Sequence, residues 1–168
     1  MEIWDVTDRD GRVLGRCERG SELPAGRYHG IVDIWVQNAA GKLLVTQRAK
    51  EKTYGLFWEN TAGSLLSGED FPEAAVRELA EETGLSVAIS ELELLERRVE
   101  RRSIWHSYFV KTNIAEDAVR LQSGETVDYR WVTRTELDDM MNRGELASPV
   151  VYRYQRVKTQ LTERGNDA

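Results

Sequence analysis

The sequence predicts an α+β fold, a sandwich in which a mixed β-sheet packs with one central helix and two carboxy-terminal helices. Three observations support this. Apolar runs of strand length, separated by Asn, Asp and Gly turns, recur along the chain. One segment with helix start and stop signals interrupts them, and two further helical patterns follow the last run. The 168 residues suggest a single domain, 1–168, large enough to bury a core.

The strands are predicted from alternating or continuous apolar side chains bounded by turn residues. They lie, in chain order, at residues 2–7, 12–16, 31–36, 43–47, 87–89, 92–99, 104–111 and 130–132. The first two form an amino-terminal β-hairpin, residues 1–18, through the hairpin turn Asp10-Gly11. We expect the third and fourth strands to pair antiparallel, and the sixth strand to pair with the seventh.

The central helix is predicted at residues 72–83. Asp70 can cap its start, Pro72 sits in its first turn, and Glu73 completes an approximate capping box. Gly84 ends the helix as a left-handed cap. A short helix at residues 136–142 and a final helix within residues 145–168 complete the expected fold.

Three carboxylates gather in the last two turns of the central helix. Glu78 and Glu82 share a face, Glu81 is a neighbour of Glu78, and Arg77 can pair with Glu81. Two full charges about 5 Å apart repel by about 3 kcal/mol in a protein cleft but by under about 1 kcal/mol in open water. The cluster therefore predicts either a solvated helix face or, in a cleft, a site for Mg²⁺ or Mn²⁺, which prefer oxygen ligands.

The segment around this helix resembles the signature of the Nudix hydrolases, G-x5-E-x7-R-E-U-x-E-E-x-G-U, where U is aliphatic. The matching residues are Gly63, Glu69, Arg77, Glu78, Leu79, Glu81, Glu82, Gly84 and Leu85. The resemblance implies a Nudix-type α/β/α sandwich. Within the family, the amino-terminal hairpin, Tyr28-His29 and residues 47–52 are most similar to the branch of isopentenyl-diphosphate isomerases and their hydrolytic relatives.

This resemblance implies Mg²⁺- or Mn²⁺-dependent hydrolysis of a diphosphate joined to another group, X, in a nucleoside-diphosphate-X-type or related small molecule. Glu78 and Glu82 would ligate the metal, and the carbonyl of Gly63 would complete the shell. Glu69 would orient the helix or bind a further metal through water. Glu81 would serve either as a ligand or as the base.

Further site residues carry over from the same resemblance. Arg77 would hold a glutamate, for instance Glu81, in the rotamer that binds metal. Glu125 precedes the last core strand, where some members place their catalytic base, but an ordinary turn residue is an equal alternative. Arg48 and Lys52 match basic contacts to the diphosphate in the isomerase branch.

Two alternatives to hydrolysis stay open. The isomerases use a cysteine just before the signature glycine and a histidine just after it, where this chain has Ala62 and Ser64. The only cysteine, Cys17, lies far away in the sequence, so an isomerase-like activity ranks second. A catalytically idle nucleotide-binding Nudix module is the other alternative, although it would have no need of the intact glutamates.

Composition narrows the partners. A net charge of −6 argues against a nucleic-acid polymer or a membrane surface, but not against a small anionic substrate. One cysteine permits no internal disulfide, and no signal peptide is recognisable, so we expect a cytoplasmic protein. The oligomeric state stays open, although homodimers are common in the family. The arginines at positions 97, 98, 101 and 102 could dock an anionic tail of the substrate, but solvated decoration of a hairpin is the favoured interpretation.

Overall fold

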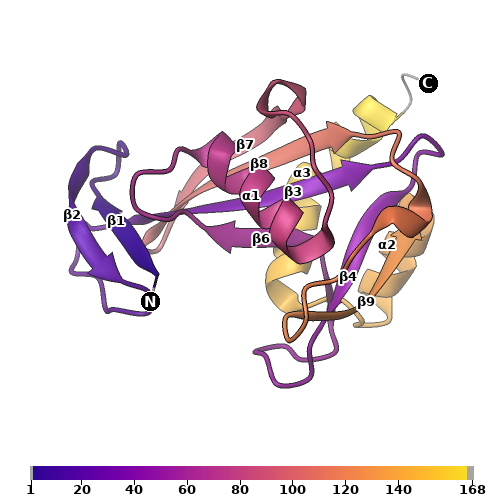
Figure 1. Cartoon of the computed structure of the whole chain (residues 1–168), viewed down its shortest axis with the longest axis horizontal. Coiled ribbons are helices and arrows are strands. Elements are labelled where there is room, and N and C mark those ends of the chain that lie inside the picture. The colour runs from indigo at the N-terminus through magenta and orange to yellow at the C-terminus, as the bar shows by residue number, and fades with distance from the viewer. Residues whose placement is uncertain (1, 166–168) are drawn as a thin grey trace.

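A computed structural model, shown in Figure 1, describes residues 2–165 and confirms the α+β fold with a mixed sheet and three α-helices. Residues 1 and 166–168, which the predicted domain and terminal segment included, lie outside the described residues. The strands are β1 Ile3–Thr7, β2 Val13–Glu18, β3 His29–Gln37, β4 Leu43–Arg48, β5 Trp58–Glu59, β6 Thr61–Ser64, β7 Glu93–Glu100, β8 Ser103–Lys111 and β9 Thr126–Val132. The helices are α1 Phe71–Thr83, α2 Arg134–Asn142 and α3 Ser148–Gly165, with short 3₁₀ turns at Ile89–Glu91 and Glu116–Ala118.

The main sheet is mixed and runs in the order β5-β4-β3-β8-β7, with β6 paired to β3 and β9 paired to β4. β3 is parallel to β8 along its whole length and antiparallel to β6. The expected antiparallel pairing of β3 with β4 is confirmed but reduced to the contact between Gln37 and Leu43. The strands diverge beyond that turn because β4 pairs with β9 instead. The predicted pairing of β7 with β8 is confirmed.

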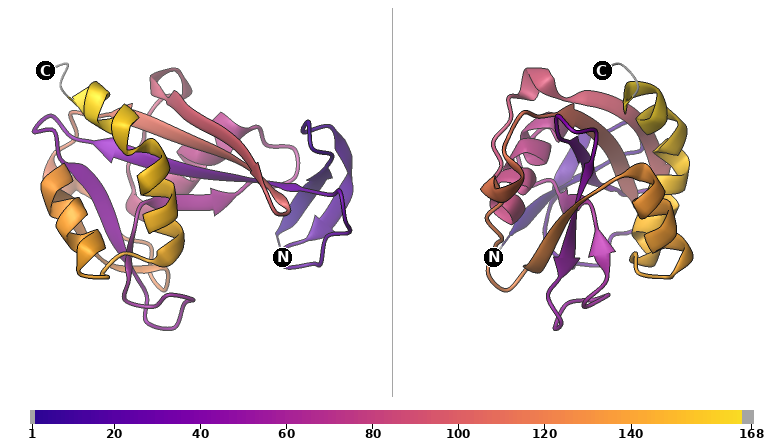
Figure 2. Two further views of the ribbon diagram at one scale, coloured as in Figure 1. Left: turned by 180° about the vertical axis from the view of Figure 1, so that it is seen from behind. Right: turned by 90° about the vertical axis from the view of Figure 1, so that its right-hand side faces the viewer.

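Helices cover both faces of the sheet, as Figures 1 and 2 show: α1 lies on one side, and α2 and α3 lie on the other. Alternation along β3 explains these layers. Val32 and Ile34 pack in the core beneath α1, with Leu79. Trp35 faces the opposite side, where its ring lies 5.6 Å from that of Tyr154 in α3. The predicted α/β/α sandwich is thereby confirmed.

The amino-terminal hairpin, β1 with β2, is also confirmed, and it touches the loop that leads into α1. Asp5 accepts hydrogen bonds from the Ser67 hydroxyl at 2.7 Å and from the Gly68 amide at 2.9 Å. The Trp4 ring stacks on His29 with centroids 4.3 Å apart. In Figure 1 the hairpin stands at one end of the molecule, away from α2 and α3, so its role toward the site is to fix this loop.

Three details differ from the prediction. The strand expected at residues 87–89 is wrong, because local turn bonds satisfy the backbone there: the Glu91 amide donates to Ala88 and the Leu92 amide to Ile89. The two short strands β5 and β6 were not predicted. The last strand, β9, begins at Thr126 and is longer than expected. Within residues 2–165, no helix is long and apolar enough to cross a membrane.

Candidate active site

Helix α1 is placed by the caps that its sequence predicts. The Asp70 side chain accepts a hydrogen bond from the Glu73 amide, and the Glu73 side chain accepts one from the Asp70 amide, each at 2.9 Å. Gly84 ends the helix with φ of 70°, in the left-handed region that glycine tolerates. Between these caps, α1 buries Ala74, Ala75 and Leu79 and presents its carboxylates along another face.

Arg77 joins three of the predicted site carboxylates into one cluster, which we call the Arg77 cluster (Arg77, Glu69, Glu78 and Glu81). Its guanidinium donates to both oxygens of Glu69, at 2.6 and 2.9 Å. It also donates to Glu78 at 2.9 Å, to Glu81 at 3.1 Å and to the Ser64 carbonyl at 3.1 Å. Hydrogen bonding to Glu69 is the main cause that raises the pKa of Arg77. Arg77 therefore holds Glu81, and it holds two further carboxylates as well.

Glu82 lies outside this cluster and lacks a full set of partners. Its Oε2 is buried and has no hydrogen-bond partner among residues 2–165. Burial, followed by repulsion from Glu59 and Glu78, raises the pKa of Glu82 to about 8, although Lys52 opposes this. A buried carboxyl beside two further carboxyls is a location that favours a bound cation.

Gly63 and Glu78 fit closely together. A Cβ built on Gly63 would overlap the Glu78 carboxylate, so any larger residue at position 63 would displace that side chain. The pKa of Glu78 is raised, mainly by burial, even though Arg77 lowers it. The requirement for glycine here is therefore steric: the strand backbone and a helix carboxylate need the same space.

Glu59 is a site residue that the sequence analysis did not identify. It lies in β5, is only 7% exposed, and is one of the two acids whose charge acts on Glu82. Arg48 donates to both of its oxygens at 2.7 Å. Arg48 is thus held against a carboxylate. The two-residue strand β5 is too short to give a periodic signal that would have identified this glutamate.

Lys52 and Glu125 are brought together from different loops and form an ion pair. The Ala49 amide donates to the Glu125 carbonyl at 2.9 Å, which fastens the loop after β4 to the segment before β9. Burial is the main cause that lowers the pKa of Lys52, and the Arg48 charge adds to it. Lys52, the expected diphosphate contact, and Glu125, the expected base, therefore neutralise each other's charge in this structure.

The donor set suits a hard divalent cation, although it is not closed around one. Within the part of the chain that the structure describes, no three His, Cys, Asp or Glu side chains form a ready metal-binding group. Glu69 and Glu81 are turned toward Arg77. The unpartnered oxygen of Glu82, the nearby Glu78 and the close Gly63 backbone nevertheless offer the oxygen ligands that Mg²⁺ and Mn²⁺ prefer.

The chain is similar in sequence and in fold to known proteins. The family model described as NUDIX domain matches residues 27–154. An uncharacterized Nudix hydrolase of Listeria monocytogenes is 30% identical over 148 residues, covering 86% of this chain and 88% of the relative. An isopentenyl-diphosphate Delta-isomerase of Burkholderia multivorans is 32% identical over 133 residues, covering 76% and 75%. The crystal structure of DR0079 from Deinococcus radiodurans has the same fold, with a TM-score of 0.74 and 22% identity, and covers 93% of this chain and 99% of that one.

Proposed function

Because the chain belongs to the NUDIX domain family, we propose that it is a hydrolase that cleaves the diphosphate linkage of a nucleoside-diphosphate-X-type or related small molecule with Mg²⁺ or Mn²⁺. The observation that carries this proposal is the buried, unpartnered Oε2 of Glu82 beside Glu59 and Glu78. A surface that only decorates a helix would leave these acids in water, where their repulsion is weak. Here they are partly desolvated, so a cation that also contacts phosphate would stabilise them.

The residues divide into ligands and supports. Glu78 and Glu82 would hold the metal with the Gly63 carbonyl, and Glu59 adds a carboxylate at the same place. Bound there, a divalent ion would neutralise phosphate charge and lower the pKa of attacking water. Arg77 supports the site from behind, because its bonds to Glu69, Glu78 and Glu81 fix their rotamers.

Substrate contacts and the base come from the two loops joined by Lys52 and Glu125. A diphosphate would compete with Glu125 for Lys52, and release of Glu125 would leave a carboxylate able to accept a proton from water. Glu81 is the alternative base, but its bond to Arg77 and its exposure favour a supporting role. Arg48 would act mainly on Glu59.

Isomerisation is less well supported, even though an isomerase is among the relatives. Ala62 supplies no thiol, and Cys17 lies in β2 of the amino-terminal hairpin, opposite Trp4. An idle binding module is opposed by the desolvated glutamates, which destabilise the fold unless a cation is bound. A cytoplasmic location, a single domain over 1–168, a homodimer and the absence of nucleic-acid and membrane partners remain predictions.

Glu82→Gln tests the proposal. We expect loss of Mg²⁺-dependent cleavage of the diphosphate linkage in nucleoside-diphosphate sugars, ADP-ribose and isoprenyl diphosphates, screened together and followed by the two phosphorylated products. Mg²⁺ should also raise the melting temperature of the wild type but not that of Glu82→Gln, while circular dichroism without metal stays unchanged. Glu163→Gln is the matched control, since this glutamate is exposed on α3. Full Mg²⁺-dependent turnover by Glu82→Gln would refute the assignment.

A further inference from the structure

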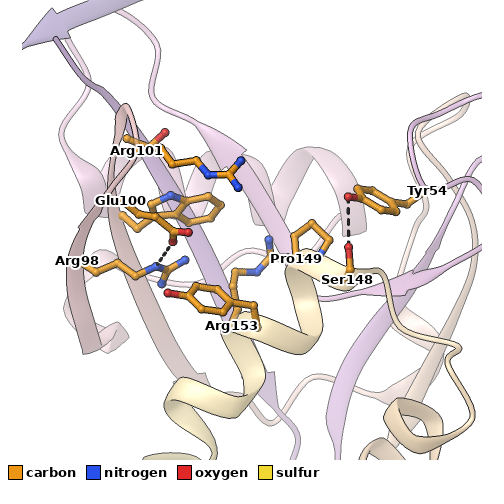
Figure 3. A pocket seen from close by; sticks show the side chains of 10 residues that line it. Tyr54, Arg98, Glu100, Arg101, Ser148, Pro149 and Arg153 are labelled. Carbon is orange, nitrogen blue, oxygen red and sulfur yellow. Dashed lines mark hydrogen bonds and ion pairs between the residues drawn. The ribbon is translucent and has the colours of Figure 1, made fainter. Parts of the chain in front are cut away.

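A hollow lies between the β7–β8 turn and the start of α3, and Figure 3 shows it. Its volume is about 450 Å³. Three arginines line it, and we call it the arginine pocket (Arg98, Arg101 and Arg153). One lining carboxylate, Glu100, faces them. In Figure 3 the three guanidinium groups are directed toward the same space. The pocket therefore has an excess of positive charge along its lining.

Two of these arginines are buried with hydrogen-bonding capacity to spare. Arg98 is 9% exposed and Arg153 is 5% exposed. The Nε of each has no hydrogen-bond partner within residues 2–165, although Arg98 Nε lies 3.5 Å from a Glu100 oxygen. A buried donor without a partner is unfavourable, so the residues around these two guanidinium groups do not satisfy them completely. The sequence favours solvent exposure for the arginines at positions 97, 98, 101 and 102, and this prediction is wrong for Arg98, which is buried.

The surrounding acids do not cancel the positive charge. Glu96 accepts from Arg98 at 3.1 Å, but it also pairs with Arg156 and so is shared between two cations. Arg153 donates to Asn60 at 3.0 Å, and the buried Asp33 attracts it. Arg101 forms no ion pair among the residues that the structure describes and is exposed at the mouth of the pocket. It is therefore the arginine most available to a ligand.

Arg153 connects the pocket to the proposed site through packed side chains. Arg153 contacts Asn60, which directly follows Glu59 in the chain, and the charges of Glu59 and Glu82 both act on Arg153. The opposite wall is Tyr54, whose hydroxyl accepts a hydrogen bond from Ser148 at 3.2 Å and which belongs to the same loop as Lys52. A diphosphate held between Lys52 and the glutamates would thus have one of the two groups that it joins near the arginine pocket.

On the premise that the chain is a diphosphate hydrolase, we propose that the arginine pocket binds a phosphate monoester carried by one of the two groups that the substrate's diphosphate joins. Such a group has about two negative charges at neutral pH and three acceptor oxygens. Guanidinium groups match phosphate oxygens in geometry and remain charged when buried. The preferred substrates are therefore diphosphates in which one of the two joined groups bears an additional phosphate, rather than those in which neither group does.

The test uses two substrate pairs that differ by one phosphate monoester: NADPH against NADH, and coenzyme A against dephospho-coenzyme A. We expect kcat/KM with Mg²⁺ to favour the phosphorylated member of at least one pair by about tenfold, as a charge-assisted contact predicts. Arg101→Asn should remove most of this ratio. Asparagine suits the position, because Arg101 has φ of 49° in the left-handed region. Arg102→Asn is the matched control, since Arg102 is adjacent to Arg101 in the chain but does not line the pocket.

Calorimetry with the same pairs, in the presence of a chelator, measures binding without turnover and separates the two proposals. Tighter binding of a phosphorylated member that is lost in Arg101→Asn and kept in Arg102→Asn supports the proposal that the pocket binds phosphate. If the same protein hydrolyses no diphosphate, the hydrolase proposal alone fails. Hydrolysis that ignores the extra phosphate in both pairs, or equal effects of the two variants, overturns the pocket and leaves the hydrolase proposal standing.

Discussion

Two clusters built around arginine in this molecule differ in how completely their hydrogen bonds are made. In the Arg77 cluster, one guanidinium contacts three carboxylates and a backbone carbonyl, at 2.6 to 3.1 Å. In the arginine pocket, Arg98 and Arg153 are more deeply buried, yet each keeps an Nε without a hydrogen-bond partner within residues 2–165.

The difference separates support from recognition. A fully bonded cluster resists rearrangement and can fix the rotamers of its members. A buried cluster with unused donors leaves bonding capacity for a ligand. Glu82 is an acidic example of the same kind, because its buried Oε2 has no hydrogen-bond partner among residues 2–165 and could bind a cation. Unsatisfied groups therefore mark where the metal and the substrate are expected to bind.

Among substitutions that test the contrast between the two clusters, Arg153→Met is expected to have the largest effect on the free energy of unfolding. Asp33 is fully buried, and without Arg153 it keeps hydrogen bonds from the Ser107 hydroxyl at 2.7 Å and the Asn60 amide at 3.2 Å, while Arg98 is the one cation left whose charge attracts it among the described residues. An uncompensated buried charge should lower the free energy of unfolding by about 3–5 kcal/mol, measured by urea denaturation. Asp33→Asn in the same chain should recover part of the loss, because it removes the charge. A loss below about 1 kcal/mol would show that the two are not coupled.

A smaller effect on stability, but a clear one on metal binding, is expected from Arg77→Lys. The Arg77 and Glu69 side chains are 21% and 20% exposed, so water screens the cluster and the loss of stability should be about 1–2 kcal/mol. One ammonium cannot reproduce the bonds of the guanidinium fork, so Glu78 should lose its fixed rotamer and Mg²⁺ affinity should fall about 10–100-fold. Thermal shift against Mg²⁺ concentration measures this.

Arg16→Lys serves as the control for that change. Arg16 is 70% exposed and pairs with Asp5 at 3.4 Å, away from α1. It should leave both unfolding and Mg²⁺ affinity unchanged, since exposed pairs contribute little. If Arg77→Lys behaved like Arg16→Lys, the bonds of Arg77 would have no supporting role, and the contrast between the two clusters would be lost.

Local signals explain what the sequence could predict. The caps at Asp70 and Gly84 and the spacing of Glu78 and Glu82 act within one helix, so they can be read directly from the chain. The pairing of Arg77 with Glu81 is of the same kind and is confirmed at 3.1 Å. The layers of the sandwich follow from alternation along the core strands.

Long-range packing explains what the sequence could not predict. β5 has only two residues, too few for a periodic pattern, so the contact of Glu59 with Arg48 was not foreseen. Arg98 appears in a run of charges that is typical of a solvated strand, and only the packing of α3 buries it. Burial of a charged residue by a distant helix leaves no local trace.

The smallest expected effect concerns Glu96, which joins the wall of the arginine pocket to α3. Hydrogen bonding from Arg156 is the main cause that lowers the pKa of Glu96, so its ionised form stabilises the folded protein. This contribution is present above the pKa of an unfolded glutamate, about 4.3, and is lost as the pH falls through the lower folded-state value. Glu96→Gln should therefore lower the free energy of unfolding near neutral pH by under about 1 kcal/mol, because Arg156 is 38% exposed.

Denaturation curves over a range of pH test this for Glu96→Gln beside Glu93→Gln. Glu93 pairs with Arg164 at 2.7 Å but is 54% exposed, against 17% for Glu96, so its change should be smaller still. The wild-type and Glu96→Gln stabilities should converge as acid protonates Glu96. If they instead stayed parallel down to acid pH, Glu96 would act by packing alone. Arg98 and Arg156 would then not share the charge of the Glu96 carboxylate, which the account of the pocket's positive charge assumes.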